Sequence, residues 1–484
     1  MKKPDILFIM CDQFRYDAIA AHGNKRILTP NLDMLVQEGK SYHMAYSNCP
    51  VCVPARYSIM SGCMPCNTGI YSNLVRSNKV KERCGKYLAS VMSEAGYRTF
   101  GIGKFHTSPF DEDLGFDIQL RSEELWNNLH QRYDLDDYAK YIHESYPEYS
   151  HIEQLQGERT DMYYMPQTRA LPEKCCAERW LTERAKEQLS LEDKRPYFGF
   201  LSFIQPHPPC APPVPYNRMY DPDEMQNPIQ TNQDIDFCDE QIPFMNRLIW
   251  ADEINPFLAR SVKARYYGEI SYIDSCIGEI INFVRARGNI DNTVIFFFAD
   301  HGDHMGDHHA WQKESFFDQS AKIPFIVWCG KNIKQRPKGE LACLTDLFAT
   351  ATGLAGVCEC RDGVDLFEKV RERVVGIYGE PGTRLFKCMV RDERYKYIYL
   401  SNGGRELLFD MQADPDEKNP VDKQTVLEKM RNELRNVLLA NEQTKCMVTE
   451  TGFVSYPYQE REAKRIRQFD LSSGVKDFTV HFKG

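Results

Sequence analysis

The chain has 484 residues, of which 42% are hydrophobic and 27% are charged, proportions that are ordinary for a globular protein and exclude a largely disordered one. Its formal net charge of -9 and the lack of any basic block argue against a nucleic-acid partner. No apolar run reaches the length of a membrane-spanning helix, so the sequence predicts no membrane partner either.

The N-terminal segment and the cysteines bear on the compartment. A basic start is followed by a short apolar run at residues 6–11 that leads into acidic and polar residues, so we interpret it as a buried strand and not as a signal peptide. The 17 cysteines are an odd number, and Cys175 and Cys176 are adjacent, which favours reduced thiols over a disulfide framework. The sequence therefore predicts a cytoplasmic protein, although a chain trimmed of its leader would show the same pattern.

Short apolar runs bounded by polar residues predict the strands of a buried sheet, with helical stretches between several of them. The strands are expected at residues 6–11, 97–103, 197–204, 293–299 and 323–328. Isoleucines at helical spacing predict one long helix over residues 263–287, which Gly288 ends, and shorter helices are expected over 31–36 and 177–189. The alternation predicts an α/β fold in which helices flank a large, mostly parallel sheet.

The pattern of predicted elements changes at about residue 365, where short strands replace the alternation of strands and helices. Strands are predicted at residues 374–378, 387–390 and 395–400, followed by a helix from about 425 to 439 and a polar tail. We therefore predict a large domain over residues 1–365 and a smaller α+β domain over residues 366–484. Two irregular stretches, 108–167 and 208–260, are interpreted as insertions that surround the site of the large domain and shape its ligand choice.

Cys52, Pro54 and Arg56 stand close together, directly ahead of an apolar run. Proline suits the first turn of a helix because its missing N–H costs nothing there. A helix that begins here would place Cys52 at its positive end and Arg56 one turn further along the same side. The pattern predicts a catalytic cysteine.

The neighbouring cysteines allow simpler interpretations. Cys49 and Cys52 form one C-x2-C pair and Cys63 and Cys66 form another, so the four thiols could bind zinc, act as a redox pair or simply be buried. The ten residues between the pairs are fewer than a zinc ribbon usually has, and their pattern is helical. A non-catalytic, zinc-stabilised module stays open as an alternative at this point.

Several polar side chains directly follow predicted strands. Because ligands bind outside the carboxyl ends of the strands in such sheets, we expect these side chains to converge. Carboxylate oxygens with one imidazole suit a divalent cation, calcium first and magnesium second, and Asp12, Asp300 and His301 supply them. The residues that follow the strands are Asp12, Lys104, His106, His207, Asp300 and His301.

The segment from Cys52 to Arg56 resembles the modification motif of the formylglycine-dependent sulfatases, which belong to the alkaline-phosphatase-like superfamily. In these enzymes the cysteine of Cys-x-Pro-x-Arg is oxidised to an aldehyde. Three more segments resemble sulfatase segments in the same order along the chain: Gly103-Lys104-Phe105-His106, Gln205-Pro206-His207-Pro208-Pro209, and Ala299-Asp300-His301-Gly302 with the later Lys313. One departure is Gln13, which stands where many members have a second aspartate.

The resemblance implies an alkaline-phosphatase-like fold and a nucleophile at position 52. A maturation enzyme would oxidise Cys52 to formylglycine, and one hydroxyl of the hydrated aldehyde would attack sulfur. Residue 52 would join Asp12, Asp300 and His301 around one divalent cation, to which Gln13 adds a neutral oxygen or nothing.

The resemblance also implies roles for the remaining residues. Arg56, Lys104 and Lys313 would neutralise the charge of the sulfate. His207 would protonate the leaving-group oxygen, and His106 would deprotonate the second hydroxyl so that sulfate is expelled and the aldehyde is regenerated.

The substrate implied is a sulfate monoester, either a small molecule such as an aryl or steroid sulfate or a sulfated sugar or oligosaccharide. A phosphonate monoester or phosphodiester hydrolase of the same superfamily is the alternative. Lys104 and His106 favour sulfate, because phosphonate-cleaving relatives generally carry uncharged hydroxyl residues at those places.

Overall fold

A computed structural model describes residues 3–75, 78–123, 133–150, 163–232, 235, 238–248, 255–357 and 359–461. Parts of the two predicted insertions, namely 124–132, 151–162, 233, 234, 236, 237 and 249–254, lie outside the described residues. The end of the predicted polar tail, beyond residue 461, also lies outside them.

A seven-stranded sheet forms the centre of the fold, with the strand order β2-β8-β7-β1-β6-β4-β5. β1 is the middle strand and pairs in parallel with β6 and β7, and β4 pairs in parallel with β6 and β5. β8 runs antiparallel to both of its neighbours. The strands are β1 Asp5–Cys11, β2 Lys40–Ser41, β4 Arg98–Gly103, β5 Ile118–Arg121, β6 Tyr197–Phe203, β7 Thr293–Ala299 and β8 Phe325–Cys329.

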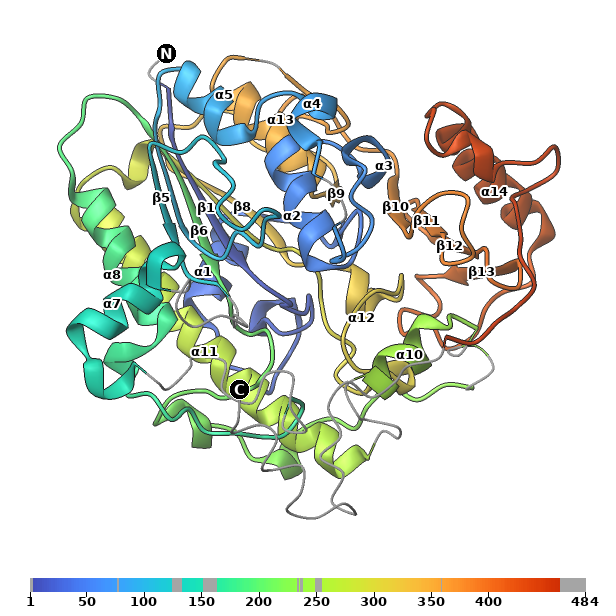
Figure 1. The fold of residues 1–484 in the computed structure, drawn as a ribbon, viewed down its shortest axis with the longest axis horizontal. Helices are drawn as coiled ribbons and strands as arrows, with labels where there is room; N and C mark the ends of the chain where they lie inside the picture. The colour runs from blue at the N-terminus through green and yellow to red at the C-terminus, as the bar shows by residue number, and fades with distance from the viewer. Residues whose placement is uncertain are drawn as a thin grey trace.

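Helices cover both faces of this sheet (Figure 1). α1, α8 and α11 pack together on one face, and α2, α5 and α13 form the layer on the other. Because both faces are covered, β1, β4, β6 and β7 are buried along their whole length, which explains their continuous apolar sequences. The main helices are α1 Pro30–Glu38, α2 Cys52–Ser61, α5 Leu88–Glu94, α8 Ala177–Ser190, α11 Pro256–Ala286 and α13 Thr345–Leu354.

Shorter elements complete this part of the molecule. A two-stranded parallel sheet pairs β3 with β9 beside the main sheet. The short strands and helices are β3 Met44–Tyr46, β9 Leu341–Cys343, α3 Pro65–Thr68, α4 Val80–Cys84, α7 Asp137–Ser145, α10 Gln241–Leu248 and α12 Asp318–Ala321. Within the described ranges, no helix is both long enough and apolar enough to cross a membrane.

A second, antiparallel sheet of four strands follows in the order β10-β11-β12-β13, and α14 packs on it. Its elements are β10 Val374–Tyr378, β11 Lys387–Arg391, β12 Tyr395–Leu400, β13 Arg405–Asp410 and α14 Gln424–Leu439. The strands and the helix predicted after residue 365 are confirmed, and β13 is an additional strand. The domain division at residue 365 stays a prediction.

The prediction of an irregular insertion over residues 108–167 is wrong where β5 and α7 lie, and that over 208–260 is wrong where α10 and the start of α11 lie. β5 is an edge strand of the main sheet, and its residues are partly or fully exposed, so its sequence carries no apolar run. The long helix α11 begins at Pro256, earlier than the predicted residue 263. The Asn255 side chain caps it by accepting hydrogen bonds from the N–H groups of Phe257 and Leu258.

The side chain of Phe8, in the middle strand β1, is fully buried, and its ring packs edge to face against Phe198 and Phe298. We predict that Phe8→Ala lowers the free energy of unfolding by about 3–5 kcal/mol, because it leaves a cavity at the centre of the sheet. Phe257 is 62% exposed, so Phe257→Ala is a matched control that should change stability by about 0.5 kcal/mol or less. Denaturant unfolding measures both, and equal losses would contradict the prediction.

Candidate active site

Cys52 is the first residue of α2, as predicted. Val51 precedes the helix in an extended conformation, Pro54 lies in its first turn, and all residues of α2 are buried. The Cys52 side chain is therefore held at the positive end of the helix dipole and is only 1% exposed.

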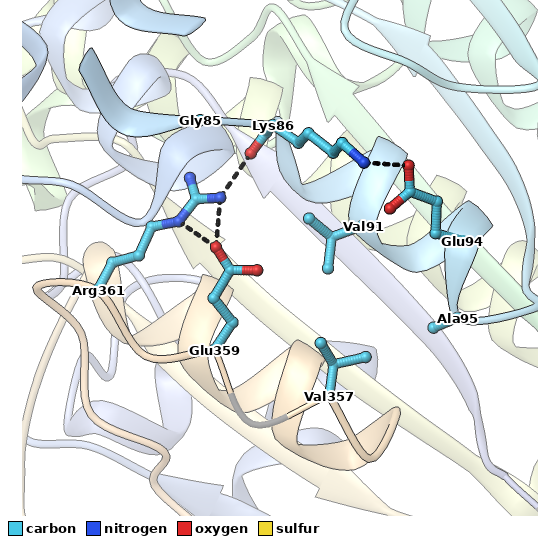
Figure 2. Close-up of a pocket in the computed structure, with 8 residues that line it drawn as sticks. All are labelled: Gly85, Lys86, Val91, Glu94, Ala95, Val357, Glu359 and Arg361. Atoms are coloured by element: carbon cyan, nitrogen blue, oxygen red, sulfur yellow. Dashed lines mark hydrogen bonds and ion pairs between the residues drawn. The ribbon is translucent and has the colours of Figure 1, made fainter. Parts of the chain in front are cut away.

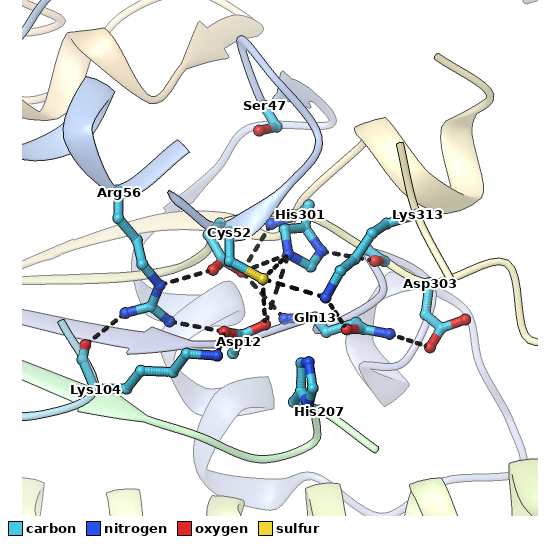
Figure 3. Close-up of polar contacts among 12 residues, drawn as sticks. Asp12, Gln13, Ser47, Cys52, Arg56, Lys104, His207, His301, Asp303 and Lys313 are labelled. Carbon is cyan, nitrogen blue, oxygen red and sulfur yellow. Dashed lines mark hydrogen bonds and ion pairs between the residues drawn. The ribbon is translucent and has the colours of Figure 1, made fainter. Parts of the chain in front are cut away.

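Arg56 lies one turn along α2 and bridges two carboxylates that come from neighbouring strands (Figure 3). Its Nη2 donates to Asp12 Oδ2 at 3.0 Å, and its Nε donates to Asp300 Oδ2 at 3.1 Å. Asp12 follows β1 and Asp300 follows β7, so the parallel pairing of these strands brings both carboxylates to the same edge. Arg56 Nη1 also donates to the hydroxyl of Ser202, at 3.0 Å.

Asp12, Cys52, Asp300 and His301 form one compact group. Their potential ligand atoms lie within 4.8 Å of one another, and all four side chains are buried. His301 Nε2 lies 3.2 Å from Cys52 Sγ and 3.6 Å from Asp12 Oδ1. His301 Nδ1 lies 2.9 Å from the carbonyl oxygen of Gly302, so Nδ1 donates its proton there and Nε2 is the nitrogen that faces the group.

This group fits a divalent cation. Burial, together with the nearby Asp12 carboxylate, raises the pKa of Asp300, which shows that negative charge is crowded here. A cation among the two carboxylates would relieve that crowding, and carboxylate oxygens are the ligands that calcium and magnesium prefer. Among the described residues this is the one group of its kind, and it does not include Cys49, Cys63 or Cys66. The zinc-stabilised module is therefore not supported.

Two buried lysines flank Cys52. Lys313 Nζ donates to Cys52 Sγ at 3.2 Å, and Lys104 Nζ lies 2.5 Å from Asp12 Oδ2. Burial and Asp12 would raise the pKa of the Cys52 thiol, but Lys313, Lys104 and His301 outweigh them and hold that pKa well below its usual value. The surroundings of position 52 therefore stabilise negative charge, as the site of an anionic substrate requires.

The two predicted catalytic histidines differ in their surroundings. His207 is 3% exposed, and its Nδ1 lies 2.8 Å from the carbonyl oxygen of Pro208, so Nε2 is the nitrogen that can exchange a proton. Burial, Lys313 and Lys104 hold the pKa of His207 well below its usual value. His106 is partly exposed, with its backbone N–H bonded to Glu123 at 3.0 Å. His106 lies in the segment that directly follows β4, three residues after the strand ends.

A family model described as Sulfatase matches residues 4–357, which is well over half of the chain. The chain belongs to the sulfatase family. The predicted family is thereby confirmed, and the protein is a sulfuric ester hydrolase. An arylsulfatase of Clostridium perfringens is 28% identical to it over 451 residues, covering 86% of this chain and 89% of that protein.

Two solved structures share its fold. The phosphonate monoester hydrolase of Agrobacterium radiobacter aligns with a TM-score of 0.74 at 22% identity, covering 94% of this chain and 100% of that one. A 2-O GAG sulfatase aligns with a TM-score of 0.70, also at 22% identity, covering 96% of this chain and 99% of that one. These matches confirm the predicted α/β, alkaline-phosphatase-like fold.

The sulfatase site also contains Asp303 and Tyr164, which the sequence analysis does not predict. Gln13 links them to the site: its Oε1 accepts a hydrogen bond from Lys313 Nζ at 2.6 Å, and its Nε2 donates to Asp303 Oδ2 at 2.5 Å. The hydroxyl of Tyr164 donates to the same oxygen of Asp303 at 2.7 Å. The position of Asp303 three residues after Asp300 is the signal that could have drawn attention to it.

Two of the three histidines that follow Asp303 are not at the surface. His304 and His308 are fully buried, whereas His309 is partly exposed. The His308 ring stacks on Phe317 with centroids 4.3 Å apart, and His304 Nε2 lies 2.7 Å from the Ser315 hydroxyl. They pack behind the site and are not members of the cation-binding group.

A surface pocket of about 390 Å3 lies elsewhere on the sulfatase, between the segment that leads into α5 and the segment that follows α13 (Figure 2). Its charges are paired with one another: Lys86 with Glu94, and Arg361 with Glu359. It contains none of the predicted site residues. Its lining is Gly85, Lys86, Val91, Glu94, Ala95, Val357, Glu359 and Arg361.

Proposed function

We propose that this sulfatase hydrolyses a sulfate monoester with a formylglycine hydrate made from Cys52 by a maturation enzyme. The observation that carries the proposal is the convergence of Cys52 with two carboxylates, an imidazole and Lys313 at the start of α2. In the unmodified chain the Cys52 thiol occupies the place of the hydroxyls of the hydrated aldehyde. A thiol or a serine hydroxyl could not release sulfate by elimination, whereas a hydrate can.

Asp12, Asp300, His301 and residue 52 would hold one cation, which we propose to be calcium, with magnesium as the second choice. When bound, the cation supplies Lewis-acid polarisation of a sulfate oxygen and of a hydroxyl of residue 52. Gln13 Oε1 accepts a hydrogen bond from Lys313 and keeps a second lone pair, so this contact leaves it available as a neutral ligand.

The basic side chains would bind the sulfate group. Lys313 lies on one side of position 52, while Lys104 and Arg56 both contact Asp12. Their positive charges would offset the negative charge that the reacting oxygens carry as one hydroxyl of residue 52 attacks sulfur.

His207 and His106 would move the protons. The lowered pKa of His207 leaves it neutral beside two lysines, and an anionic substrate would offset the lysines and raise that pKa toward the range of a general acid. His207 would then protonate the leaving oxygen. His106 would remove the proton of the second hydroxyl, so that the bond from residue 52 to sulfate breaks and the aldehyde re-forms.

The substrate class is a small-molecule or oligosaccharide sulfate ester. The arylsulfatase relative and the 2-O GAG sulfatase structure support an aryl or sugar sulfate. Phosphonate monoester hydrolysis is the second candidate, because a hydrolase of that class shares the fold and Gln13 follows Asp12. We favour sulfate, since Lys104 is a buried cation in the site.

The thiols support the predicted cytoplasmic location. Cys175 and Cys176 are adjacent buried thiols, and Cys49, Cys63 and Cys66 are thiols as well. Unpaired cysteines at such density are typical of a reducing compartment. We therefore propose that the enzyme works in the cytoplasm.

When the protein is produced together with a formylglycine-generating enzyme, we predict that residue 52 is an aldehyde. Mass spectrometry of the tryptic peptide covering residues 41–56 measures the conversion. Cys63→Ser is the control, because it removes a neighbouring thiol without affecting the peptide. A thiol at position 52 in a preparation with full sulfatase activity would show that the nucleophile is assigned wrongly.

Asp300→Ala should abolish both metal content and turnover, because it removes one of the two carboxylates of the cation-binding group. Elemental analysis after desalting measures the metal, and circular dichroism checks the fold. Asp307→Ala is a control, since Asp307 is equally buried but binds Arg15. Full metal content in the Asp300 variant would mean that the ligands lie elsewhere.

The matured enzyme should have a higher kcat/KM for an aryl or sugar sulfate than for an aryl phosphonate monoester. His106→Ala should release one equivalent of the alcohol and then stall, because expulsion of sulfate lacks its base. His207→Ala should slow substrates with poor leaving groups far more than nitrophenyl sulfate. A preference for the phosphonate would favour the second candidate, and equal losses on all leaving groups would remove His207 as the general acid.

A further inference from the structure

Glu123 lies beside the turn that carries His106, at the carboxyl end of the neighbouring strand. β4 and β5 pair in parallel, with Gly103 opposite Arg121, so the residues that follow the two strands emerge side by side. Glu123 Oε1 accepts from the backbone N–H of Phe105 at 2.7 Å and from that of His106 at 3.0 Å. Glu123 is 7% exposed, so one buried carboxylate binds two successive N–H groups of this turn.

The turn needs such a partner because of its backbone conformation. His106 has a φ of 52°, which lies in the left-handed region that a residue with a side chain seldom adopts. Turns of this kind point successive N–H groups in one direction, and the concavity that the groups form suits an anion. Phe105 is only 2% exposed, so its N–H would be left unbonded in a buried place if the acceptor were removed. The carboxylate of Glu123 therefore stabilises the conformation of the turn at His106.

Glu123 is itself fixed through the N-terminus of α7. Its backbone N–H donates to Asp136 Oδ2 at 2.9 Å. The other oxygen of Asp136 accepts from the N–H of Ala139 at 2.8 Å, so the same side chain caps α7. Because α7 also packs against β5, the carboxylate of Glu123 is held between a regular helix and a regular strand.

Lys104, two residues before His106, is held by other groups. Its N–H donates to the carbonyl oxygen of Ser202 at 2.9 Å, and its carbonyl oxygen accepts from Arg56 Nη1. The two N–H groups that Glu123 binds lie beyond Lys104 in the chain. Removal of the Glu123 carboxylate should therefore displace His106 and leave the lysine in place.

We propose that Glu123 is a positioning residue, which holds the left-handed turn at His106 and so sets its imidazole for the proton that it removes. In that step the imidazole takes the proton of the second hydroxyl of residue 52, and the electron pair of that O–H bond forms the carbonyl bond. The bond from the carbon of residue 52 to the sulfate oxygen breaks, and sulfate leaves with the electron pair of that bond. The inference deepens the proposed function and rests on it, because His106 must be the base for the position of its ring to matter.

Glu123→Ala is the first test, with 4-nitrophenyl sulfate as the substrate of the matured holoenzyme. The good leaving group makes the first sulfuryl transfer fast, and that transfer does not use His106. We expect kcat to fall by about 10- to 100-fold, because a misplaced base slows the expulsion of sulfate. KM should fall by the same factor, so that kcat/KM, which reports the steps up to the first transfer, changes by less than about twofold.

Rapid quenching and mass spectrometry of the peptide that contains residue 52 give a second readout. In Glu123→Ala, one equivalent of nitrophenol should appear in a burst while the sulfate ester of residue 52 accumulates. A merely structural role for Glu123 would lower kcat/KM together with kcat and would leave no such ester.

The double variant tests whether Glu123 acts through His106. Glu123→Ala combined with His106→Ala should be no slower than His106→Ala alone, because the ring that Glu123 positions is then missing. Losses that multiply in the double variant would assign Glu123 a separate role and would overturn the inference.

Two conservative variants define what the side chain supplies. Both N–H groups converge on one oxygen, which a glutamine amide also offers, so Glu123→Gln should keep kcat within about threefold of the wild-type value. Glu123→Asp keeps the charge but withdraws the carboxylate by one methylene group. It should show the parallel fall of kcat and KM, and it replaces the alanine variant if that variant does not fold.

Asp117→Ala is the matched control. Asp117 Oδ2 accepts from the backbone N–H of Thr99 at 3.0 Å, so this carboxylate binds the start of β4 as Glu123 binds the turn after its end. Its removal should leave kcat and KM unchanged, and circular dichroism checks the fold of every variant.

Wild-type kcat in both Glu123→Ala and Glu123→Asp, or a fall in kcat/KM as large as that in kcat, would overturn the inference. So would equal losses in Glu123→Gln and Glu123→Ala, because the accepting oxygen would then not be what holds the turn. Failure of the proposed function is recognised separately, by a wild-type enzyme that lacks the aldehyde or by a His106→Ala variant that shows no burst.

Discussion

The contact of Arg56 with Asp12 and Asp300 is the interaction on which the site depends. Two carboxylates from adjacent strands meet at 0% exposure, and without a buried cation between them their repulsion would oppose the closure of this edge of the sheet. Arg56 is one turn from Cys52 on α2, so the same bond fixes the start of the helix over the strand ends. One guanidinium group therefore positions both the strand ends and residue 52.

The C-terminal sheet supports both loops that approach position 52. The backbone N–H of Ile377, on β10, donates to the carbonyl oxygen of Asn48, shortly before Cys52. The hydroxyl of Tyr378 donates at 2.7 Å to Glu314, which directly follows Lys313. Although Cys52 and Lys313 belong to the part of the chain that holds the large sheet, their separation is held in part by β10. A domain boundary at residue 365 would thus divide two structural units that together hold the site in place.

The sequence predicts those parts of the fold in which burial leaves a continuous apolar run. β1, β6 and β7 are recognisable because both faces of the sheet are covered, and Asp12 and Asp300 follow because they directly succeed such runs. β5 lies at an edge, where its residues are only partly buried or exposed, so no continuous apolar run marks it. The direction of β8 depends on its connection to β7, which periodicity does not report.

The same limit applies within the site. Asp303 and Tyr164 join the site only through contacts with each other and with Gln13, across separations of 139 and 290 residues along the chain. A motif shows residue types at a fixed spacing, and it contains no information on which end of an amide faces a lysine. The sequence therefore predicted the groups that the structure brings together around Cys52, and it did not predict the contacts of Gln13 with Asp303 and Lys313.

The burial of residue 52 limits when a modifying enzyme can reach it. A side chain that is 1% exposed at the start of a fully buried helix is out of reach of any other protein once the chain has folded. If formylglycine is the nucleophile, each molecule must be modified before its fold closes, and a molecule that folds first stays inactive for as long as it remains folded. The active fraction of the enzyme would then depend on the rate of modification relative to the rate of folding during synthesis. It would not depend on the stability of the folded protein.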